Sequence, residues 1–173
     1  MLLINFSMMA ENFSFDVVSD FDRQELVNTL DQVKREIAQR YDLKGTDTTV
    51  ELEKESVFII TNSELTLNSV IDIIRQKATK RKLSLKIFDF ESIEVISGNR
   101  VKQNIKLIKG LEQEIAKKIS KELRSNIKKI NVSIQGDSLR VASKSKNDLQ
   151  LAIGMMDNFE ETFKIPLQKN NYR

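Results

Sequence analysis

The sequence contains no cysteine and no histidine. Their absence removes disulfide bridges, thiolate nucleophiles, Ser-His-Asp triads, zinc sites of the usual ligand types and iron–sulfur clusters. Most enzyme classes are therefore disfavoured. We expect a protein that is not an enzyme, with no catalytic residues, no bound metal and no cofactor.

Long apolar runs and clustered glycines are also missing. No apolar run approaches the roughly 18 residues that a membrane span requires. The five glycines are scattered, so no Gly-rich phosphate loop of the Walker or dinucleotide type is present. Residues 1–12 have neither a basic n-region nor an A-x-A-like cleavage site, so we expect a disordered or mis-assigned N-terminal extension rather than a signal peptide. These features predict a cytoplasmic protein with no membrane partner.

Charge is distributed unevenly along the chain, although the net charge is only +3. Residues 1–55 contain 6 Lys and Arg against 12 Asp and Glu, whereas residues 101–150 contain 12 against 5. A basic segment of this kind is typical of proteins that bind nucleic acid or a phosphorylated ligand, but it also fits a solvated, Lys-rich helix face.

Hydrophobic spacing predicts the same series of elements twice. The predicted helices cover residues 22–41, 67–78, 110–126 and 149–159. The predicted strands cover residues 13–19, 48–54, 56–62, 85–90, 102–109, 130–134, 139–141 and 167–172. Gly136 and Asp137 separate two alternating runs and predict a tight hairpin. Phe58 lies in a continuous apolar run, which we interpret as core.

Each series reads helix-strand-strand-helix-strand and needs one further strand at its start. The result is an α+β protein with two ferredoxin-like domains of β-α-β-β-α-β plan. The strands 13–19 and 102–109 are available for the two starting positions. Periodicity alone allows each strand to join the helix that follows it, and equally allows the two strands to be exchanged.

The first candidate site is a basic stripe on the predicted helix 110–126. Its members follow one another at intervals of four, three and four residues: Lys117, Lys121, Arg124 and Lys128. This spacing places them on one side of a helix, where they could follow the phosphates of RNA or another polyanion. A solvated helix face is the alternative.

The second candidate site lies around the predicted hairpin and the helix that follows. Its members are Gln135, Arg140, Lys144 and Lys146. An arginine offers a planar fork for guanine or phosphate, and a glutamine amide can bind a base edge. The alternative is that Gly136 and Asp137 only make the turn and that Arg140 pairs with a nearby carboxylate.

Several short motifs resemble the YajQ family of small bacterial proteins. The matching stretches are Ser14–Ser19, Arg40–Gly45, Ile134–Asp137, Leu139–Val141, Asp148–Gln150, Pro166–Gln168 and Asn171–Arg173. The resemblance implies two ferredoxin-like domains that exchange their first strands. One domain then comprises residues 22–109, with 102–109 as its first strand, and the other comprises residues 13–20 and 110–173.

The same resemblance implies a function. Members of the family are described as nucleotide-binding proteins, with cyclic di-GMP as the ligand of some and RNA association suggested for the group. We therefore expect a non-enzymatic, regulatory nucleotide-binding protein whose ligand phosphates meet Lys or Arg and whose guanine edges meet Gln135 or Arg140. The alternatives are an RNA-associated accessory protein that uses the basic stripe, and a protein-interaction adaptor.

Overall fold

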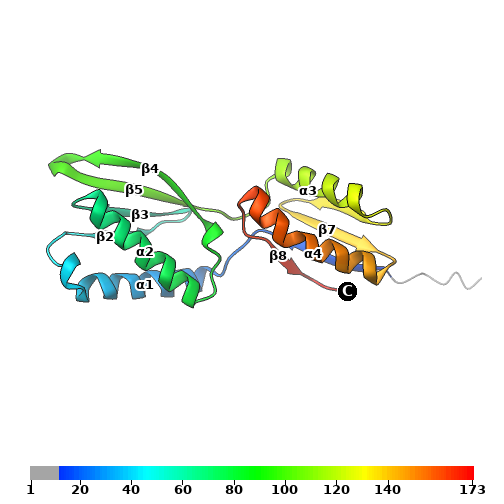
Figure 1. The fold of residues 1–173 in the computed structure, drawn as a ribbon, viewed down its shortest axis with the longest axis horizontal. Coiled ribbons are helices and arrows are strands. Elements are labelled where there is room, and N and C mark those ends of the chain that lie inside the picture. The colour runs from blue at the N-terminus through cyan, green and yellow to red at the C-terminus, as the bar shows by residue number, and fades with distance from the viewer. Residues whose placement is uncertain (1–11) are drawn as a thin grey trace, which may run out of the picture. The chain divides into compact units, whose positions relative to one another are not determined.

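The computed structural model describes residues 12–173, and they form two compact units (Figure 1). The N-terminal unit is Asp20–Lys109, and the C-terminal unit joins the chain up to Ser19 with Gly110–Arg173. The predicted disordered or mis-assigned extension covers residues 1–12. Of these, residues 1–11 lie outside the described range, and only Asn12 lies within it.

The N-terminal unit contains a four-stranded antiparallel sheet with the order β2-β3-β5-β4. Its elements are α1 (Arg23–Gln39), β2 (Thr49–Leu52), β3 (Ser56–Thr61), α2 (Glu64–Lys80), β4 (Phe88–Ile96) and β5 (Arg100–Leu107). Buried side chains of α1 and α2 pack against one face of this sheet. The other face is its open face.

The C-terminal unit contains a second four-stranded antiparallel sheet, with the order β6-β7-β1-β8. Its elements are β1 (Phe13–Val18), α3 (Gln113–Asn126), β6 (Asn131–Gln135), β7 (Ser138–Ser143), α4 (Lys146–Phe163) and β8 (Gln168–Asn170). Here too the helices cover one face, and the strands expose the other.

The two sheets exchange their first strands. β1 precedes the whole N-terminal unit but lies between β7 and β8, and β5 lies between β3 and β4. With β1 and β5 in these positions, each sheet has the strand arrangement of the ferredoxin-like plan. The predicted α+β class, with two ferredoxin-like domains, is confirmed, and the sheet order decides between the two assemblies that periodicity left open.

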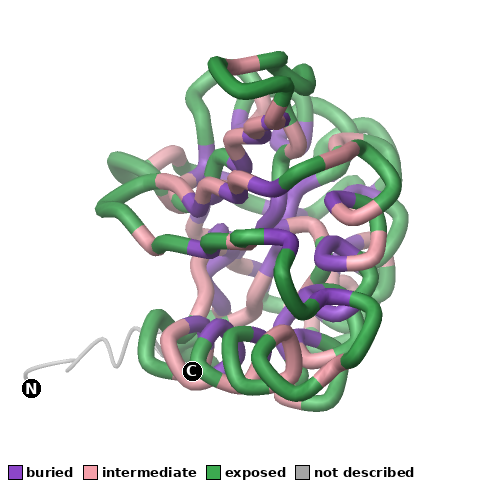
Figure 2. The backbone as a smooth tube through the Cα atoms, turned by 90° about the vertical axis from the view of Figure 1, so that its left-hand side faces the viewer, coloured by how far each residue is buried: buried purple, intermediate pink, exposed green. Residues whose placement is uncertain are grey.

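The local sequence explains most of these elements. In α1, Leu26, Leu30 and Val33 recur on one side of the helix and are almost completely buried. The Asp22 carboxylate accepts hydrogen bonds from the first-turn amides, and Ser145 caps α4 in the same way. Figure 2 shows buried residues alternating with exposed ones along the helices. The helices therefore form where apolar residues recur at helical spacing after a residue that caps the first turn.

The predicted strand 85–90 is wrong in its bounds. Leu85–Ile87 form a short 3₁₀ turn, and β4 begins at Phe88 and continues to Ile96. A register shift between Phe90 and Ile93 interrupts its pairing with β5. The part of β4 beyond this shift is mostly exposed, and Ile93 and Val95 alternate with Glu94 there without being buried.

The predicted helix 110–126 begins later than expected, at Gln113. Gly110 has a φ of +88°, which a helix does not accommodate, and Glu112 is the N-cap residue. The predicted hairpin is present, because Gln135 pairs with Ser138 across Gly136 and Asp137. None of the helices within residues 12–173 has the length and apolar character needed to cross a membrane.

A substitution in β5 tests the strand exchange. Ile105 is completely buried in the core of the N-terminal unit. We expect Ile105→Ala to lower the free energy of unfolding by about 2–5 kcal/mol, because it leaves a cavity in a packed core. Amide hydrogen exchange should show reduced protection in β3 and β4 and unchanged protection in β7.

The control is Val95→Ala on β4, because Val95 is 72% exposed. It should change the free energy of unfolding by less than about 0.5 kcal/mol. A loss of protection in β7, with β3 unaffected in Ile105→Ala, would contradict the placement of β5.

Candidate functional site

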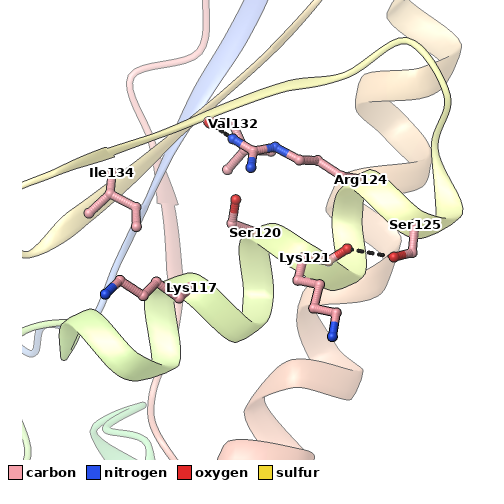
Figure 3. Close-up of a pocket in the computed structure, with 7 residues that line it drawn as sticks. All are labelled: Lys117, Ser120, Lys121, Arg124, Ser125, Val132 and Ile134. Atoms are coloured by element: carbon pink, nitrogen blue, oxygen red, sulfur yellow. Dashed lines mark hydrogen bonds between the residues drawn. The ribbon is translucent and has the colours of Figure 1, made fainter.

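A groove lies between helix α3 and strand β6, which is an edge strand of its sheet. Its volume is about 600 Å³. The lining residues are Lys117, Ser120, Lys121, Arg124, Ser125, Val132 and Ile134, and Figure 3 shows how they lie. We call this the α3–β6 groove.

The groove combines cations with an apolar floor. Arg124 extends from α3 across to β6, where its Nη2 donates a hydrogen bond of 2.6 Å to the Val132 carbonyl (Figure 3). Lys117 lies on the same helix, below Ile134. Val132 is buried and Ile134 half-buried, so an apolar ligand surface could rest against both. The groove is therefore suited to a ligand that carries both phosphate and apolar parts.

Ser120 supplies a hydroxyl inside the groove. The residue is only 4% exposed, and Figure 3 shows its oxygen directed toward β6. Within the described range, this hydroxyl forms no hydrogen bond to the protein. Ser125 differs, because its hydroxyl donates to the Lys121 carbonyl at 2.8 Å. A hydroxyl that faces the groove without a protein partner can bond to a ligand oxygen.

The free edge of β6 adds main-chain donors. Gly136 and Asp137 form a two-residue turn, so Gln135 and Ser138 are the hydrogen-bonded pair that closes the hairpin. Because pairing alternates along an antiparallel strand, the N–H groups of Val132 and Ile134 point away from β7. The bond from Arg124 to the Val132 carbonyl agrees with this direction. These N–H groups can donate to an anion in the groove.

Three of the four residues of the predicted basic stripe line the groove. Lys128 does not, because α3 ends at Asn126 and Ile127 is its C-cap. The prediction that all four share one helix face is therefore wrong for Lys128. The Lys121 ammonium points away from β6, at the outer rim of the groove (Figure 3). Lys118, outside the groove, pairs with Glu114 at 2.8 Å.

The second predicted set centres on Arg140, which lies on the open face of the C-terminal sheet. Its Nε donates to Oδ1 of Asp16 at 2.9 Å, and its Nη2 donates to Oδ2 at 3.1 Å. Asn171 donates to the same Oδ2 at 2.9 Å. Arg140 and then Asn171 hold the pKa of the Asp16 carboxyl below its ordinary value. Arg140 therefore pairs with a nearby carboxylate, which leaves fewer of its N–H groups for a ligand.

The other members of this set do not gather around Arg140. Gln135 is exposed at the end of β6 and pairs with Ser138 at the start of β7. Lys144 and Lys146 are exposed beyond the other end of β7, on either side of the N-cap of α4. The length of β7 separates them from Gln135, and six residues of strand span roughly 20 Å.

Sequence reasoning placed Phe58 in the core, and the structure corrects this. Its neighbours Val57 and Ile59 are completely buried, but Phe58 is half-buried on the open face, with the Lys102 ammonium 5.1 Å from its ring centre. An uninterrupted apolar run conceals which face each residue occupies. Within residues 12–173, no group of three Asp, Glu, His or Cys side chains is placed to hold a metal ion.

Ser120 and the partners of Arg140 were also missed. A serine in an amphipathic helix carries no signal that its hydroxyl is directed into a groove. The alternative that Arg140 pairs with a nearby carboxylate did not identify Asp16, because only the exchange of strands pairs β1 with β7.

Comparison with known proteins shows the same family along nearly the whole chain. A family model described as "Nucleotide-binding protein YajQ-like" matches residues 13–173. A protein from Prochlorococcus marinus subsp. pastoris, named a nucleotide-binding protein, is 80% identical over 165 residues, which cover 95% of this chain and 100% of that protein. Another, from Prochlorococcus marinus strain MIT 9211 and also named a nucleotide-binding protein, is 61% identical over the same coverage.

The Asp16–Arg140 ion pair predicts a pH dependence of stability. Because folding lowers the pKa of Asp16, the pair contributes stability above the unfolded-state pKa of about 3.9. This contribution is lost as the pH falls from there through the folded-state pKa. We expect urea unfolding between pH 6 and pH 2 to show a smaller loss of stability in Asp16→Asn than in the wild type.

Asp157→Asn is the matched control, because Asp157 is an exposed carboxylate on α4 that forms no ion pair within the described range. Its pH profile should follow the wild type. Identical profiles for Asp16→Asn and the wild type would show that the ion pair does not contribute.

Proposed function

Because the chain belongs to the YajQ family, we propose that it is a nucleotide-binding protein that is not an enzyme and that holds its ligand in the α3–β6 groove. The observation that carries the proposal is the groove itself. Lys117, Arg124 and the Ser120 hydroxyl lie beside the apolar side chains of Val132 and Ile134 in a volume of about 600 Å³. Ligand pockets of this size commonly bind small molecules.

The groove offers groups that can contact the phosphate, the sugar and the base of a nucleotide. Lys117 and Arg124 can donate charge-assisted hydrogen bonds to phosphate oxygens. Ser120 and the outward N–H of Ile134 add neutral donors. The side chains of Val132 and Ile134 can contact the base or the sugar. Gln135, the last residue of β6, does not line the groove, because its side chain lies on the face of the strand opposite Ile134.

The first ligand to consider is cyclic di-GMP, which the family resemblance suggests and whose two phosphates match a groove with several cations. The proposed role is regulatory, because a ligand that prefers one state of a protein increases the population of that state. We place the phosphates in the groove rather than at Arg140, Lys144 and Lys146. Arg140 is held by Asp16, and the two lysines lie beyond the far end of β7 from the hairpin.

RNA is the second candidate. The exposed cations Lys117, Lys121 and Arg124 continue to Lys128 beyond the helix end, and such a row could follow a phosphate backbone. Binding would then depend on Lys128 as much as on Lys117, and its affinity would fall steeply with salt.

A protein-interaction adaptor is the third candidate. It is supported by apolar side chains that the N-terminal unit exposes, among them Leu65 at 79% and Val95 at 72%. Exposed apolar side chains mark interaction surfaces when they form a contiguous patch.

Calorimetric titration with cyclic di-GMP tests the groove, with GTP and a short single-stranded RNA as comparators at low and moderate salt. Lys117→Ala should weaken cyclic di-GMP binding by about 10- to 100-fold, the effect of losing a hydrogen bond between charged groups. Lys128→Ala removes the same charge outside the groove and should leave the affinity unchanged.

The comparators separate the candidates. RNA binding that collapses with salt and weakens equally in Lys117→Ala and Lys128→Ala would favour the RNA function. An unchanged cyclic di-GMP affinity in folded Lys117→Ala would show that the ligand does not bind in the α3–β6 groove. If neither cyclic di-GMP, GTP nor the RNA binds, the protein-interaction adaptor is the candidate function that remains.

A further inference from the structure

The N-terminal unit contains a separate basic cavity of about 500 Å³. The lining residues are Phe21, Arg23, Lys54, Glu55, Lys106, Leu107 and Lys109. They come from the segment before α1, the first residue of α1, the turn between β2 and β3, the end of β5 and the residues that follow it. We call this cavity the Phe21 pocket.

Hydrogen bonds to the main chain of the β2–β3 turn fix the position of this turn in the wall of the pocket. The guanidinium of Arg23 donates to the Lys54 carbonyl at 2.9 Å and to the Glu53 carbonyl at 2.6 Å. The Leu107 amide donates to the Glu55 carbonyl at 2.9 Å. The turn is thereby tied to both α1 and β5, so the pocket is preorganised for a ligand.

One wall of the pocket is apolar. Phe21 is half-buried and packs against the core of the N-terminal unit, and its amide donates to the Asp20 side chain at 2.7 Å. Leu107 is only 6% exposed. A phenyl ring held in this way offers a surface on which a planar base can stack.

The remaining walls carry an excess of positive charge. Lys54 and Lys106 are exposed and form no ion pair within the part of the chain that the structure describes. Lys109 pairs with Asp20 at 3.0 Å, but its side chain is still 61% exposed. Glu55 is the one carboxylate among the lining residues. The pocket is therefore electrostatically suited to an anion.

We infer that the Phe21 pocket binds a nucleoside monophosphate, with the base against Phe21 and Leu107 and the phosphate at Lys54 and Lys106. An inorganic anion would leave the apolar wall without a contact, and an uncharged nucleoside would leave the lysines without one. Glu55 can accept a hydrogen bond from a base amino group or a ribose hydroxyl. The inference does not depend on the α3–β6 groove, because the two sites share no residue and lie in different units.

Titration of the ¹⁵N-labelled full chain tests this site, with GMP, guanosine and inorganic phosphate added separately and the amide signals followed by NMR. GMP should shift the amides of Phe21, Glu55 and Leu107 in a saturable way. Guanosine and phosphate should bind at least 10-fold more weakly at the same amides. Lys54→Ala/Lys106→Ala should weaken GMP binding at least 10-fold, because it removes both unpaired ammonium groups.

Two control variants and one further test variant complete the experiment. Lys44→Ala/Lys102→Ala removes two positive charges from the same unit outside the pocket and should leave GMP binding unchanged. Phe21→Leu keeps an apolar side chain against the core but removes the ring, and should weaken GMP binding while phosphate binding stays the same. Lys117→Ala should leave the shifts of the Phe21 pocket intact, so failure of one site is distinguishable from failure of the other.

Unshifted amides around the Phe21 pocket with GMP would overturn the inference. So would equal affinities for GMP and inorganic phosphate, because the apolar wall would then play no part. An unchanged GMP affinity in folded Lys54→Ala/Lys106→Ala would overturn it as well.

Discussion

The C-terminal unit depends on the insertion of β1 between β7 and β8. Pairs from Phe13–Ser143 to Val18–Ser138 join β1 to β7, and β8 has no other neighbouring strand in its sheet. The chain end also returns to β1, since Ser14 and Arg173 exchange main-chain hydrogen bonds of 3.1 and 3.0 Å. Without β1 the hairpin that carries one wall of the α3–β6 groove would lose its support.

The same insertion decides what Arg140 can do. β1 brings the Asp16 carboxylate directly opposite Arg140, and the two side chains form a bidentate pair. A guanidinium engaged in this way holds the sheet together and contributes less to ligand binding. Lys117 and Arg124 have no such carboxylate across from them on β6, so their charge is available in the groove.

Both basic cavities form where a helix meets the boundary of a sheet. In the α3–β6 groove, Arg124 joins the helix to the free edge of β6, and in the Phe21 pocket Arg23 joins the start of α1 to the β2–β3 turn. In each case an arginine binds main-chain carbonyls and fixes the walls, while lysines remain exposed. Each arginine thus has a structural bond, and Arg124 keeps further N–H groups that can donate to a ligand.

The sequence by itself determined the α+β class, most helix positions, the hairpin at Gly136 and the basic character of α3, because all of these follow from local periodicity and turn chemistry. Periodicity could not place Phe58 on the open face or extend β4 to Ile96, since β3 has apolar residues on both faces and the far part of β4 exposes its apolar residues. Only the tertiary structure decided that β1 and β5 are exchanged, that Arg140 binds Asp16 and that Ser120 faces a groove. These features depend on which distant segments meet, and a pattern along one segment carries no information about its partner.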